Sequence, residues 1–199
     1  MDQLVRGLAV PVPAAPLRDR RRAAVRIRRV DPRDVSLLDA FIRGLSPASR
    51  QWRFHVGIRE LAPPWLERMA HPDPADELAL VALTTDGGRD VCVAEARYVL
   101  SEEIAVGREF ALAVADGWQG RGIGKTLLLS LGAHAMRQGV PRLVGDVLRD
   151  NLAMLALART LGYTVQRHPA DPRLVRVERS FAAAVVASRP RVLAAESFI

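Results

Sequence analysis

The segment from Gln119 to Lys125 limits what this 199-residue chain can fold into, because it places three glycines within five residues. An alternating apolar pattern predicts a strand at 109–114 before it, and helical spacing predicts a helix at 125–138 after it. Glycines at such a junction let backbone N–H groups converge, since no Cβ blocks the close approach of an anion. The first N–H groups of the helix and its positive dipole end strengthen this effect. The segment therefore predicts a phosphate-binding loop.

Two better-known phosphate loops do not fit its spacing. A Walker A loop ends in Gly-Lys-Thr, as residues 124–126 do, but its first glycine would fall on Gln119. A dinucleotide fingerprint has glycines spaced two and then three residues apart, whereas those in this loop are spaced two and two. Both the P-loop and the dinucleotide-binding classes are therefore excluded.

Strand and helix patterns alternate along most of the chain, which favours a mixed α/β domain at 24–181. Apolar runs predict strands at 24–30, 78–84, 91–100, 109–114, 143–148, 163–167 and 174–181. Helical spacing with Asp, Ser and Pro start signals predicts helices at 31–45, 46–54, 63–69, 125–138 and 151–160. A glycine-rich turn at 86–88 joins two of the strands as a hairpin.

The net charge of +7 belongs mostly to the N-terminal end of the chain. Residues 1–29 hold eight Arg against Asp2 and Asp19, a net of +6, and the remaining residues hold 21 basic and 20 acidic side chains. We interpret this as a flexible arm at 1–23, rich in Arg and Pro, and a nearly neutral domain followed by an Ala-rich tail at 182–199. Such a domain is not expected to bind nucleic acid.

Composition excludes several classes of protein. With 49% apolar residues the chain can bury a core, and its single Cys cannot form a disulfide within the chain. No stretch reaches the roughly 18 apolar residues of a membrane span, and the N-terminus lacks the apolar run of a secretory signal. Four His residues on separate elements show no metal-ligand spacing. We therefore expect a cytoplasmic protein that neither associates with a membrane nor holds a metal ion. Cys92 is expected to be a small buried residue.

Further segments accompany the Gln-x-x-Gly-x-Gly loop in a fixed order. Asn151 starts the helix after the next strand, and Leu-Gly-Tyr at 161–163 follows that helix. With these segments, residues 24–181 resemble the GNAT superfamily of N-acetyltransferases. More narrowly, the chain is similar to the catalytic domain of bacterial protein lysine acetyltransferases at Gly-Leu-Ser-Pro (44–47), Asp-x-Trp-Gln-Gly-Arg-Gly (116–122) and Leu-Val-Gly-Asp-Val-Leu (143–148).

This resemblance implies a GNAT fold, in which helices flank a mixed, mostly antiparallel sheet that splays at an acetyl-CoA cleft. It implies direct transfer of an acetyl group from acetyl-CoA to an amine, without a covalent enzyme intermediate. The implied acceptor is a protein lysine. A small-molecule amine acceptor and a non-catalytic acyl-CoA-binding module are the alternatives, and a second copy of the chain is a further candidate partner.

The resemblance also assigns the residues that bind acetyl-CoA. Backbone groups of Leu112, Ala113 and Val114 would bind the pantetheine arm and the thioester carbonyl, and Asn151 would approach the arm from the other side. The pyrophosphate would lie on the loop formed by Gln119, Gly120, Arg121, Gly122, Ile123, Gly124 and Lys125. Lys125 is the only Lys of the chain, so its place in this loop makes it a candidate phosphate partner.

Two acids could take the proton from the acceptor amine. Glu109 lies where protein lysine acetyltransferases of this type carry their catalytic Glu, and Asp146 matches the base position of ribosomal-protein N-terminal acetyltransferases. Either acid could instead form an ion pair with an Arg.

Many relatives carry a Tyr as the acid for the leaving thiolate where this chain has Ala158, so no acid is assigned. Three aromatic residues could line an acceptor pocket or pack in the core: Trp52, Phe54 and Trp65.

Overall fold

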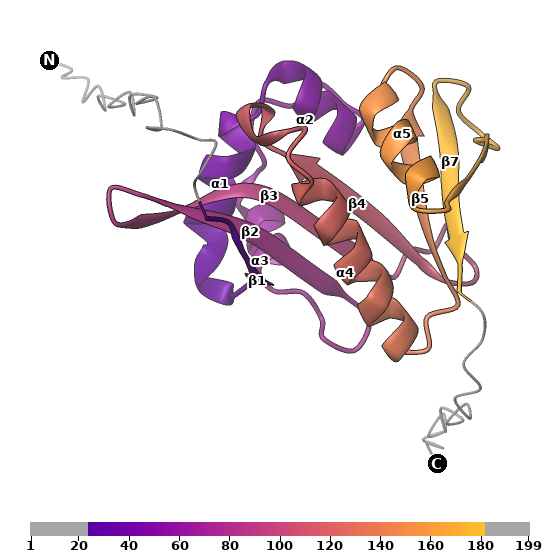
Figure 1. Cartoon of the computed structure of the whole chain (residues 1–199), viewed down its shortest axis with the longest axis horizontal. Helices are drawn as coiled ribbons and strands as arrows, with labels where there is room; N and C mark the ends of the chain where they lie inside the picture. Colours follow the sequence, from indigo (N-terminus) through magenta and orange to yellow (C-terminus); the bar gives the residue numbers. More distant parts are fainter. Residues whose placement is uncertain (1–23, 182–199) are drawn as a thin grey trace, which may run out of the picture.

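The computed structural model describes residues 24–181, so the expected arm at 1–23 and tail at 182–199 lie outside the described residues. Within this range one sheet of seven strands runs in the order β1-β2-β3-β4-β5-β7-β6 (Figure 1). Every neighbouring pair is antiparallel except β4 and β5, which run parallel. The expected mixed, mostly antiparallel α/β fold is confirmed. The strands are β1 (Arg26–Arg29), β2 (Leu78–Asp86), β3 (Arg89–Val99), β4 (Arg108–Val114), β5 (Arg142–Leu148), β6 (Thr164–Arg167) and β7 (Leu174–Ser180).

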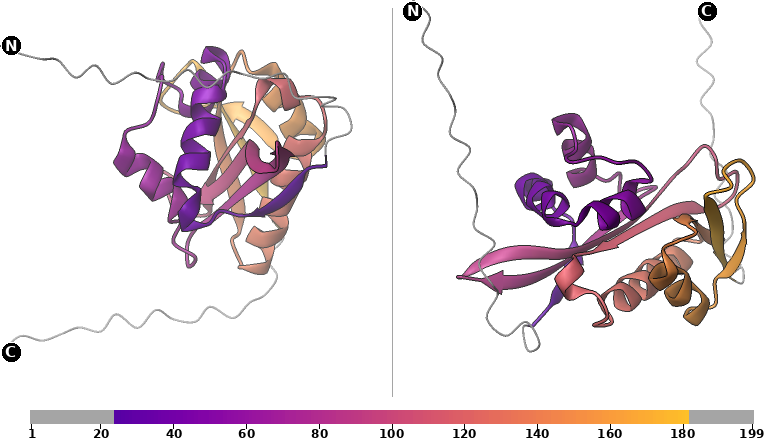
Figure 2. Two further views of the ribbon diagram at one scale, coloured as in Figure 1. Left: turned by 90° about the vertical axis from the view of Figure 1, so that its left-hand side faces the viewer. Right: turned by 90° about the horizontal axis from the view of Figure 1, so that it is seen from above.

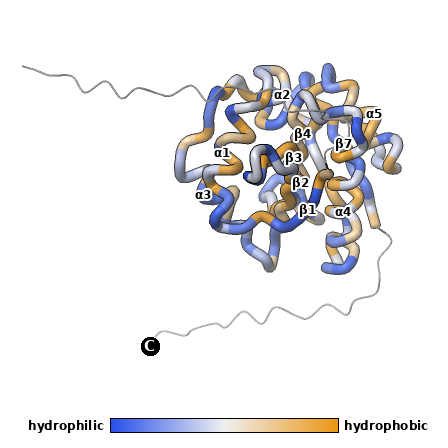
Figure 3. Tube along the Cα trace, turned by 60° about the vertical axis from the view of Figure 1, so that its left-hand side comes forward, coloured by the Kyte–Doolittle hydropathy of each residue, from blue (hydrophilic) through white to orange (hydrophobic). Residues whose placement is uncertain are grey.

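Helices cover both faces of the sheet (Figure 2). β2 lies between the two helix layers, is buried from Leu78 to Thr84, and forms a largely hydrophobic stretch in Figure 3. A strand covered on both faces carries such a continuous apolar pattern. The buried residues of the described chain accordingly form two cores, one on each side of the sheet. One face carries α1 (Val35–Gly44), α2 (Pro47–Phe54) and α3 (Pro63–Ala70), and the other carries α4 (Ile123–Arg137) and α5 (Leu152–Thr160).

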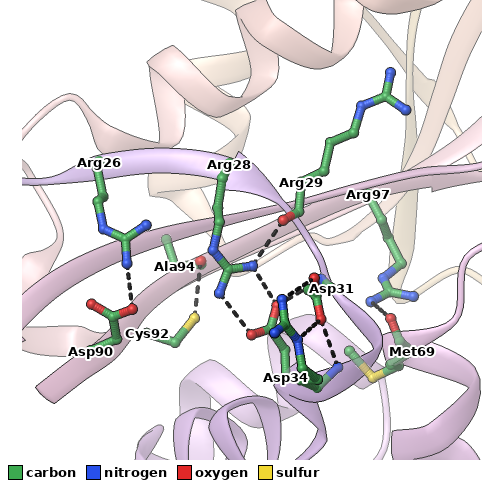
Figure 4. A network of polar contacts seen from close by, with 11 residues as sticks. Arg26, Arg28, Arg29, Asp31, Asp34, Met69, Asp90, Cys92, Ala94 and Arg97 are labelled. Atoms are coloured by element: carbon green, nitrogen blue, oxygen red, sulfur yellow. Dashed lines mark hydrogen bonds and ion pairs between the residues drawn. The ribbon is translucent and has the colours of Figure 1, made fainter.

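The first helix begins where its capping signals predict. Asp31 accepts a hydrogen bond from the backbone N–H of Arg33 (3.0 Å), and Asp34 accepts one from the N–H of Asp31 (2.8 Å). These two bonds close a capping box (Figure 4). The first turn is a 3-10 helix (Pro32–Asp34), which then continues as α1. Arg28 also donates to Asp34, at 2.7 Å from its Nη2, and so ties β1 to the start of this helix.

The sheet opens between β4 and β5. These strands stay paired for only two residues each, ending at Glu109 and Val144, whereas β5 pairs with β7 along its whole length. The ring of Phe110 lies against Gly145, where a Cβ would come within 2.7 Å of it. The facing edges of β4 and β5 therefore separate beyond Glu109, which confirms the expected splay and leaves backbone groups of β4 without a ladder partner on that side.

Candidate active site

Two hollows of similar size meet at the place where β4 and β5 separate. The first encloses about 280 Å³ beside the glycine loop, and is called the glycine-loop pocket. The second encloses about 250 Å³, contains both candidate bases, and is called the carboxylate pocket. The two pockets adjoin each other and are together called the cleft, because four residues line both of them: Trp52, Leu112, Asn151 and Met154.

The glycine-loop pocket gathers almost every residue that we expected to bind the cofactor. Arg121 is the exception among them, since its guanidinium carbon lies 4.8 Å from the centre of the Trp118 ring and it is not part of the lining. The structure therefore brings together a set of residues chosen from the sequence alone. The members that line the pocket are Leu112, Ala113, Val114, Gln119, Gly120, Gly122, Ile123, Gly124, Lys125 and Asn151.

The glycine loop has the geometry of an anion site. Gly120 and Gly122 have φ angles of 72° and 80°, and their hydrogens face open space, since a Cβ on either would meet no atom within 4 Å. α4 begins at Ile123, two residues before the predicted start, and its first backbone bond runs from the N–H of Thr126 to the carbonyl of Gly122 (3.0 Å). The N–H groups ahead of Thr126 therefore have no acceptor within the helix, and the helix dipole adds positive potential there.

The loop is fastened to α2 through Asp116. Its carboxylate accepts hydrogen bonds from the backbone N–H of Ser46 (2.9 Å), from the Ser46 hydroxyl (2.7 Å) and from the Ser49 hydroxyl (2.8 Å). Burial alone would raise the pKa of Asp116, but these donors outweigh it and hold the pKa below its usual value. Gln119 adds a further link, because its amide donates to Ser49 (3.3 Å) and to the carbonyl of Val114 (3.1 Å). The glycine loop and α2 are thus held as one unit.

Asn151 caps the helix on the opposite side of the cleft. Its side-chain oxygen accepts a hydrogen bond from the backbone N–H of Met154 (3.1 Å), so the amide nitrogen is the group that can donate into the pocket. Across the cleft, the indole N–H of Trp52 donates to Asp150 at 3.2 Å. This bond joins α2 to the loop just before α5.

The two candidate bases both line the carboxylate pocket, but only one of them is committed to other groups. Asp146 accepts hydrogen bonds from Nε and Nη2 of Arg176 (both 2.9 Å) and from Nε2 of His168 (3.1 Å). The His168 ring must carry its proton on Nε2, because its Nδ1 accepts the backbone N–H of Asp171 (2.8 Å). Among residues 24–181, Glu109 makes no side-chain hydrogen bond or ion pair. Glu109 is therefore the carboxylate that remains available to a ligand.

His55 is a site residue that sequence reasoning missed. It ends α2 with a φ angle of 60°, the one positive φ outside glycine in residues 24–181. This left-handed conformation costs about 1–3 kcal/mol, and its N–H donates to the carbonyl of Gln51 (2.8 Å). Burial lowers the pKa of the imidazole, and the charges of Asp146 and Glu109 offset only part of that effect. No spacing in the sequence links the end of α2 to β4, so no sequence signal pointed to this residue.

A buried charge cluster fixes the end of α2 on the sheet. Glu95 of β3, with its side chain 1% exposed, accepts hydrogen bonds from Arg53 (3.2 Å) and Arg97 (2.5 Å). Arg97 also donates to the carbonyl of Met69 at 3.0 Å (Figure 4). Burial would raise the pKa of Glu95, but the two guanidinium groups lower it below its usual value. The cluster keeps Arg53, and with it the wall of the carboxylate pocket, in place.

The remaining candidate residues lie in different surroundings. Of the three aromatic candidates, Trp52 and Phe54 line the carboxylate pocket, while Trp65 is 65% exposed and lines neither pocket. Cys92 is buried as expected, and burial raises the pKa of its thiol far above the usual value. Within residues 24–181 no cluster of His, Cys, Asp and Glu could hold a metal ion, and no helix is long and apolar enough to cross a membrane.

An α/β sheet that opens beside a glycine loop and a helix N-terminus defines a class of protein that can bind a ligand carrying a phosphate group in the opening. Comparison with known proteins makes the assignment specific. The sequence model of the Acetyltransferase (GNAT) family matches residues 48–163, and the chain belongs to that family. The expected superfamily is thereby confirmed, and with it an N-acetyltransferase that uses acetyl-CoA as its acetyl donor.

Three proteins place the chain more closely within the family. It is 34% identical to Acetyltransferase PA5475 of Pseudomonas aeruginosa, over 66% of this chain and 70% of that protein. It is 35% identical to Acetyltransferase Pat of Mycolicibacterium smegmatis over 56% of its length, and this stretch spans only 33% of Pat. The GNAT domain of S. lividans PAT superposes with a TM-score of 0.71 at 29% identity, covering 79% of this chain and 90% of that domain. These likenesses confirm the expected similarity to the catalytic domains of bacterial protein lysine acetyltransferases.

The residues of the glycine-loop pocket fit acetyl-CoA. Glycines with positive φ leave the loop backbone open toward a pyrophosphate, and the first turn of α4 presents N–H donors. The rest of the lining, which includes Leu112, Met154 and Leu157, is mostly apolar and suits an uncharged pantetheine arm.

Proposed function

We propose that this chain acetylates the side-chain amine of a lysine in a protein, with Glu109 as the general base. The observation that carries the proposal is the position of Glu109. It lines the carboxylate pocket at the last residue before β4 leaves β5, and its carboxylate forms no hydrogen bond or ion pair with the described residues. A carboxylate in this place attracts the lysine ammonium. The apolar faces of Trp52 and Phe54 in the same lining suit the aliphatic stem of the lysine.

The donor side of the reaction rests on backbone groups. We propose that the loop from Gly120 to Lys125 holds the pyrophosphate, and that β4 at Leu112, Ala113 and Val114 holds the pantetheine arm. Bound acetyl-CoA supplies its acetyl group as a thioester, which an amine can attack directly. A β4 N–H without a ladder partner can donate to the carbonyl oxygen as negative charge develops, an effect of about 2.7–4 kcal/mol in other enzymes. Asn151 completes the opposite wall with its amide nitrogen.

The acceptor side needs a group that removes a proton from the nitrogen. A base in such a position typically accelerates a reaction about 10²–10⁴-fold. Asp146 is the second candidate, but Arg176 and His168 already occupy its two oxygens. Taking a proton would break these bonds, so we propose a positioning role for Asp146 and the basic role for Glu109.

Acetyl transfer to defined acceptors tests the proposal. The purified chain is mixed with acetyl-CoA and lysine-containing peptides, and both thiol release and the mass of the peptide are recorded. Thiol release with one acetyl group added to the lysine is expected, and the same peptides with Arg in place of Lys should remain unmodified. Thiol release only with small amines would mean that the acceptor is a small molecule and not a protein lysine. If acetyl-CoA binds but no thiol is released with any acceptor, the chain is an acyl-CoA-binding module without catalytic activity.

Acetyl-CoA binding is tested separately from turnover. A ligand present at 100 times its Kd stabilises the folded protein by about 2.7 kcal/mol, so acetyl-CoA should raise the thermal unfolding temperature. An unchanged unfolding temperature at millimolar acetyl-CoA would contradict the donor assignment, whatever the acceptor.

A further inference from the structure

His55 is the one titratable group of the carboxylate pocket that the proposed function leaves without a task. The pocket lining contains it together with Glu109, Asp146 and Arg53. Asp146 is engaged by Arg176 and His168, and Arg53 by Glu95, so neither is free to exchange a proton. The groups of the lining that can accept one are then Glu109 and the ring nitrogen of His55 that is not bonded to the Asp146 backbone.

The backbone at His55 adds an independent observation. A residue with a side chain is rarely held at a φ of 60°, and here the helix ends on His rather than on the Gly or Asn usual for such a cap. Strained positions of this kind cluster at functional sites, where the surrounding structure holds them. The Glu95–Arg53 pair and the Trp52–Asp150 bond hold the last turn of α2, which His55 ends.

We propose that His55 is a second proton carrier of the acetyl transfer, taking the proton that the acceptor ammonium loses before it attacks the thioester. This inference rests on the proposed function and gives its site two carriers rather than one. An acceptor nitrogen that enters as an ammonium loses two protons before it becomes an amide. A single carboxylate cannot hold both of these protons at the same time.

The step balances in atoms and charge. The neutral imidazole of His55 takes one proton from the ammonium, and the freed lone pair forms the new C–N bond. Glu109 takes the second proton from the same nitrogen as the C–S bond breaks. One of the two protons then goes to the thiolate sulfur of coenzyme A and the other to water. Both side chains thereby return to their starting states.

The charges around His55 suit a group that gains and loses a proton. Asp146 on β5 favours a positive ring through its charge and through a hydrogen bond with its backbone, and Glu109 on β4 favours one through its charge, while Arg53 on the same helix disfavours one. Arg176 on β7 and the His168 ring are turned toward Asp146 and offset part of its charge. Burial lowers the pKa of the imidazole below its usual value near 6.5, so the ring is neutral at pH 7 and able to accept a proton.

His55→Asn tests the proposal, because Asn tolerates positive φ and cannot carry the proton. We expect kcat/KM for a lysine peptide to fall about 10²-fold at pH 7. The deficit should shrink steadily as the pH approaches about 10, where the amine itself becomes unprotonated. A deficit that stays constant with pH would show a structural role, and wild-type rates at every pH would show no role; both would overturn the inference.

A second acceptor sharpens the test. With an aminooxy analogue of lysine, whose nitrogen is unprotonated at neutral pH, His55→Asn should match the wild type while Glu109→Gln stays impaired. His134→Asn is the matched control, since burial also lowers the pKa of His134 but its ring pairs with Tyr98 (2.7 Å) outside both pockets. Its pH profile should be that of the wild type.

Two further measurements keep the outcome clear. If His55→Asn does not fold, His55→Gly keeps the positive φ, and added imidazole should restore part of its rate; an absence of rescue would contradict proton transfer by His55. If the wild-type chain acetylates only small amines, the proposed lysine acceptor fails. The same pH comparison is then made with that amine, so the two proposals can fail separately.

Discussion

The glycine-loop pocket and the carboxylate pocket share four lining residues but are built in different ways. Most residues of the first come from one continuous stretch of chain, 112–125, whose glycine loop offers backbone N–H groups, and the rest of its lining is mostly apolar. The second consists of side chains from α2, β4 and β5, several of them charged. A donor that never changes can be bound by backbone, whereas an acceptor is selected by side chains. Substitutions in the carboxylate pocket should therefore change catalysis while leaving the binding of acetyl-CoA intact.

The largest expected effect comes from Glu109→Gln, which removes the available carboxylate from one pocket only. We expect kcat for a lysine peptide to fall about 10²–10⁴-fold, because the nitrogen keeps its proton longer. The Kd for acetyl-CoA, measured by calorimetry, should be unchanged, since Glu109 does not line the glycine-loop pocket. Glu102→Gln, on an exposed loop position, is the control and should behave as the wild type. Equal losses of turnover and acetyl-CoA affinity would remove the distinction between the pockets.

The glycine-loop pocket could be predicted from the sequence because its parts follow one another along the chain. A strand, a turn of glycines and a helix fix where backbone N–H groups lie, and Gly122 takes the positive φ that such a turn requires. The prediction was less exact for side chains. Arg121 belongs to the same turn, yet its guanidinium carbon lies 4.8 Å from the centre of the Trp118 ring rather than in the pocket lining.

The carboxylate pocket could be predicted only in part. Glu109 and Asp146 were assigned from a family resemblance. Nothing in the sequence showed that Arg176, on the last described strand, would donate hydrogen bonds to the carboxylate of Asp146. Ser49 and His55 were missed because α2 reaches the sheet through packing and through the buried Glu95 cluster. Contacts between segments this far apart leave no period or spacing that a single sequence can reveal.

Glu95→Gln should weaken the whole fold, because it leaves Arg53 and Arg97 buried without a carboxylate. Removing one partner of a buried ion pair costs about 3–5 kcal/mol, which denaturant unfolding can measure. Since the pKa of Glu95 is lowered on folding, its contribution is present above the unfolded value near 4.3 and is lost as the pH falls through the folded value. The gap between wild type and variant should therefore close in acid. Glu60→Gln, in an exposed pair with Arg43, should change the stability little.

Asp116→Asn should affect both pockets, because Asp116 joins the glycine loop to α2. The neutral amide weakens the bonds from Ser46 and Ser49, and we expect a loss of about 1–3 kcal/mol in the free energy of unfolding. Kinetics should show a higher KM for both acetyl-CoA and the peptide, in contrast to Glu109→Gln. An increase confined to one substrate would mean that the loop and α2 do not move as a unit.

Lys125→Ala should give the smallest effect, because the ammonium is exposed to solvent and acts beside backbone donors that the substitution leaves in place. A surface charge pair contributes at most about 1 kcal/mol, so the Kd for acetyl-CoA should rise no more than about fivefold. The difference from the wild type should shrink as salt is added, since screening weakens an exposed charge but not a backbone hydrogen bond. Arg137→Ala, at the other end of α4, is the matched control and should bind acetyl-CoA normally. A much larger or salt-independent loss would mean that the glycine-loop pocket, like the carboxylate pocket, depends on a side chain.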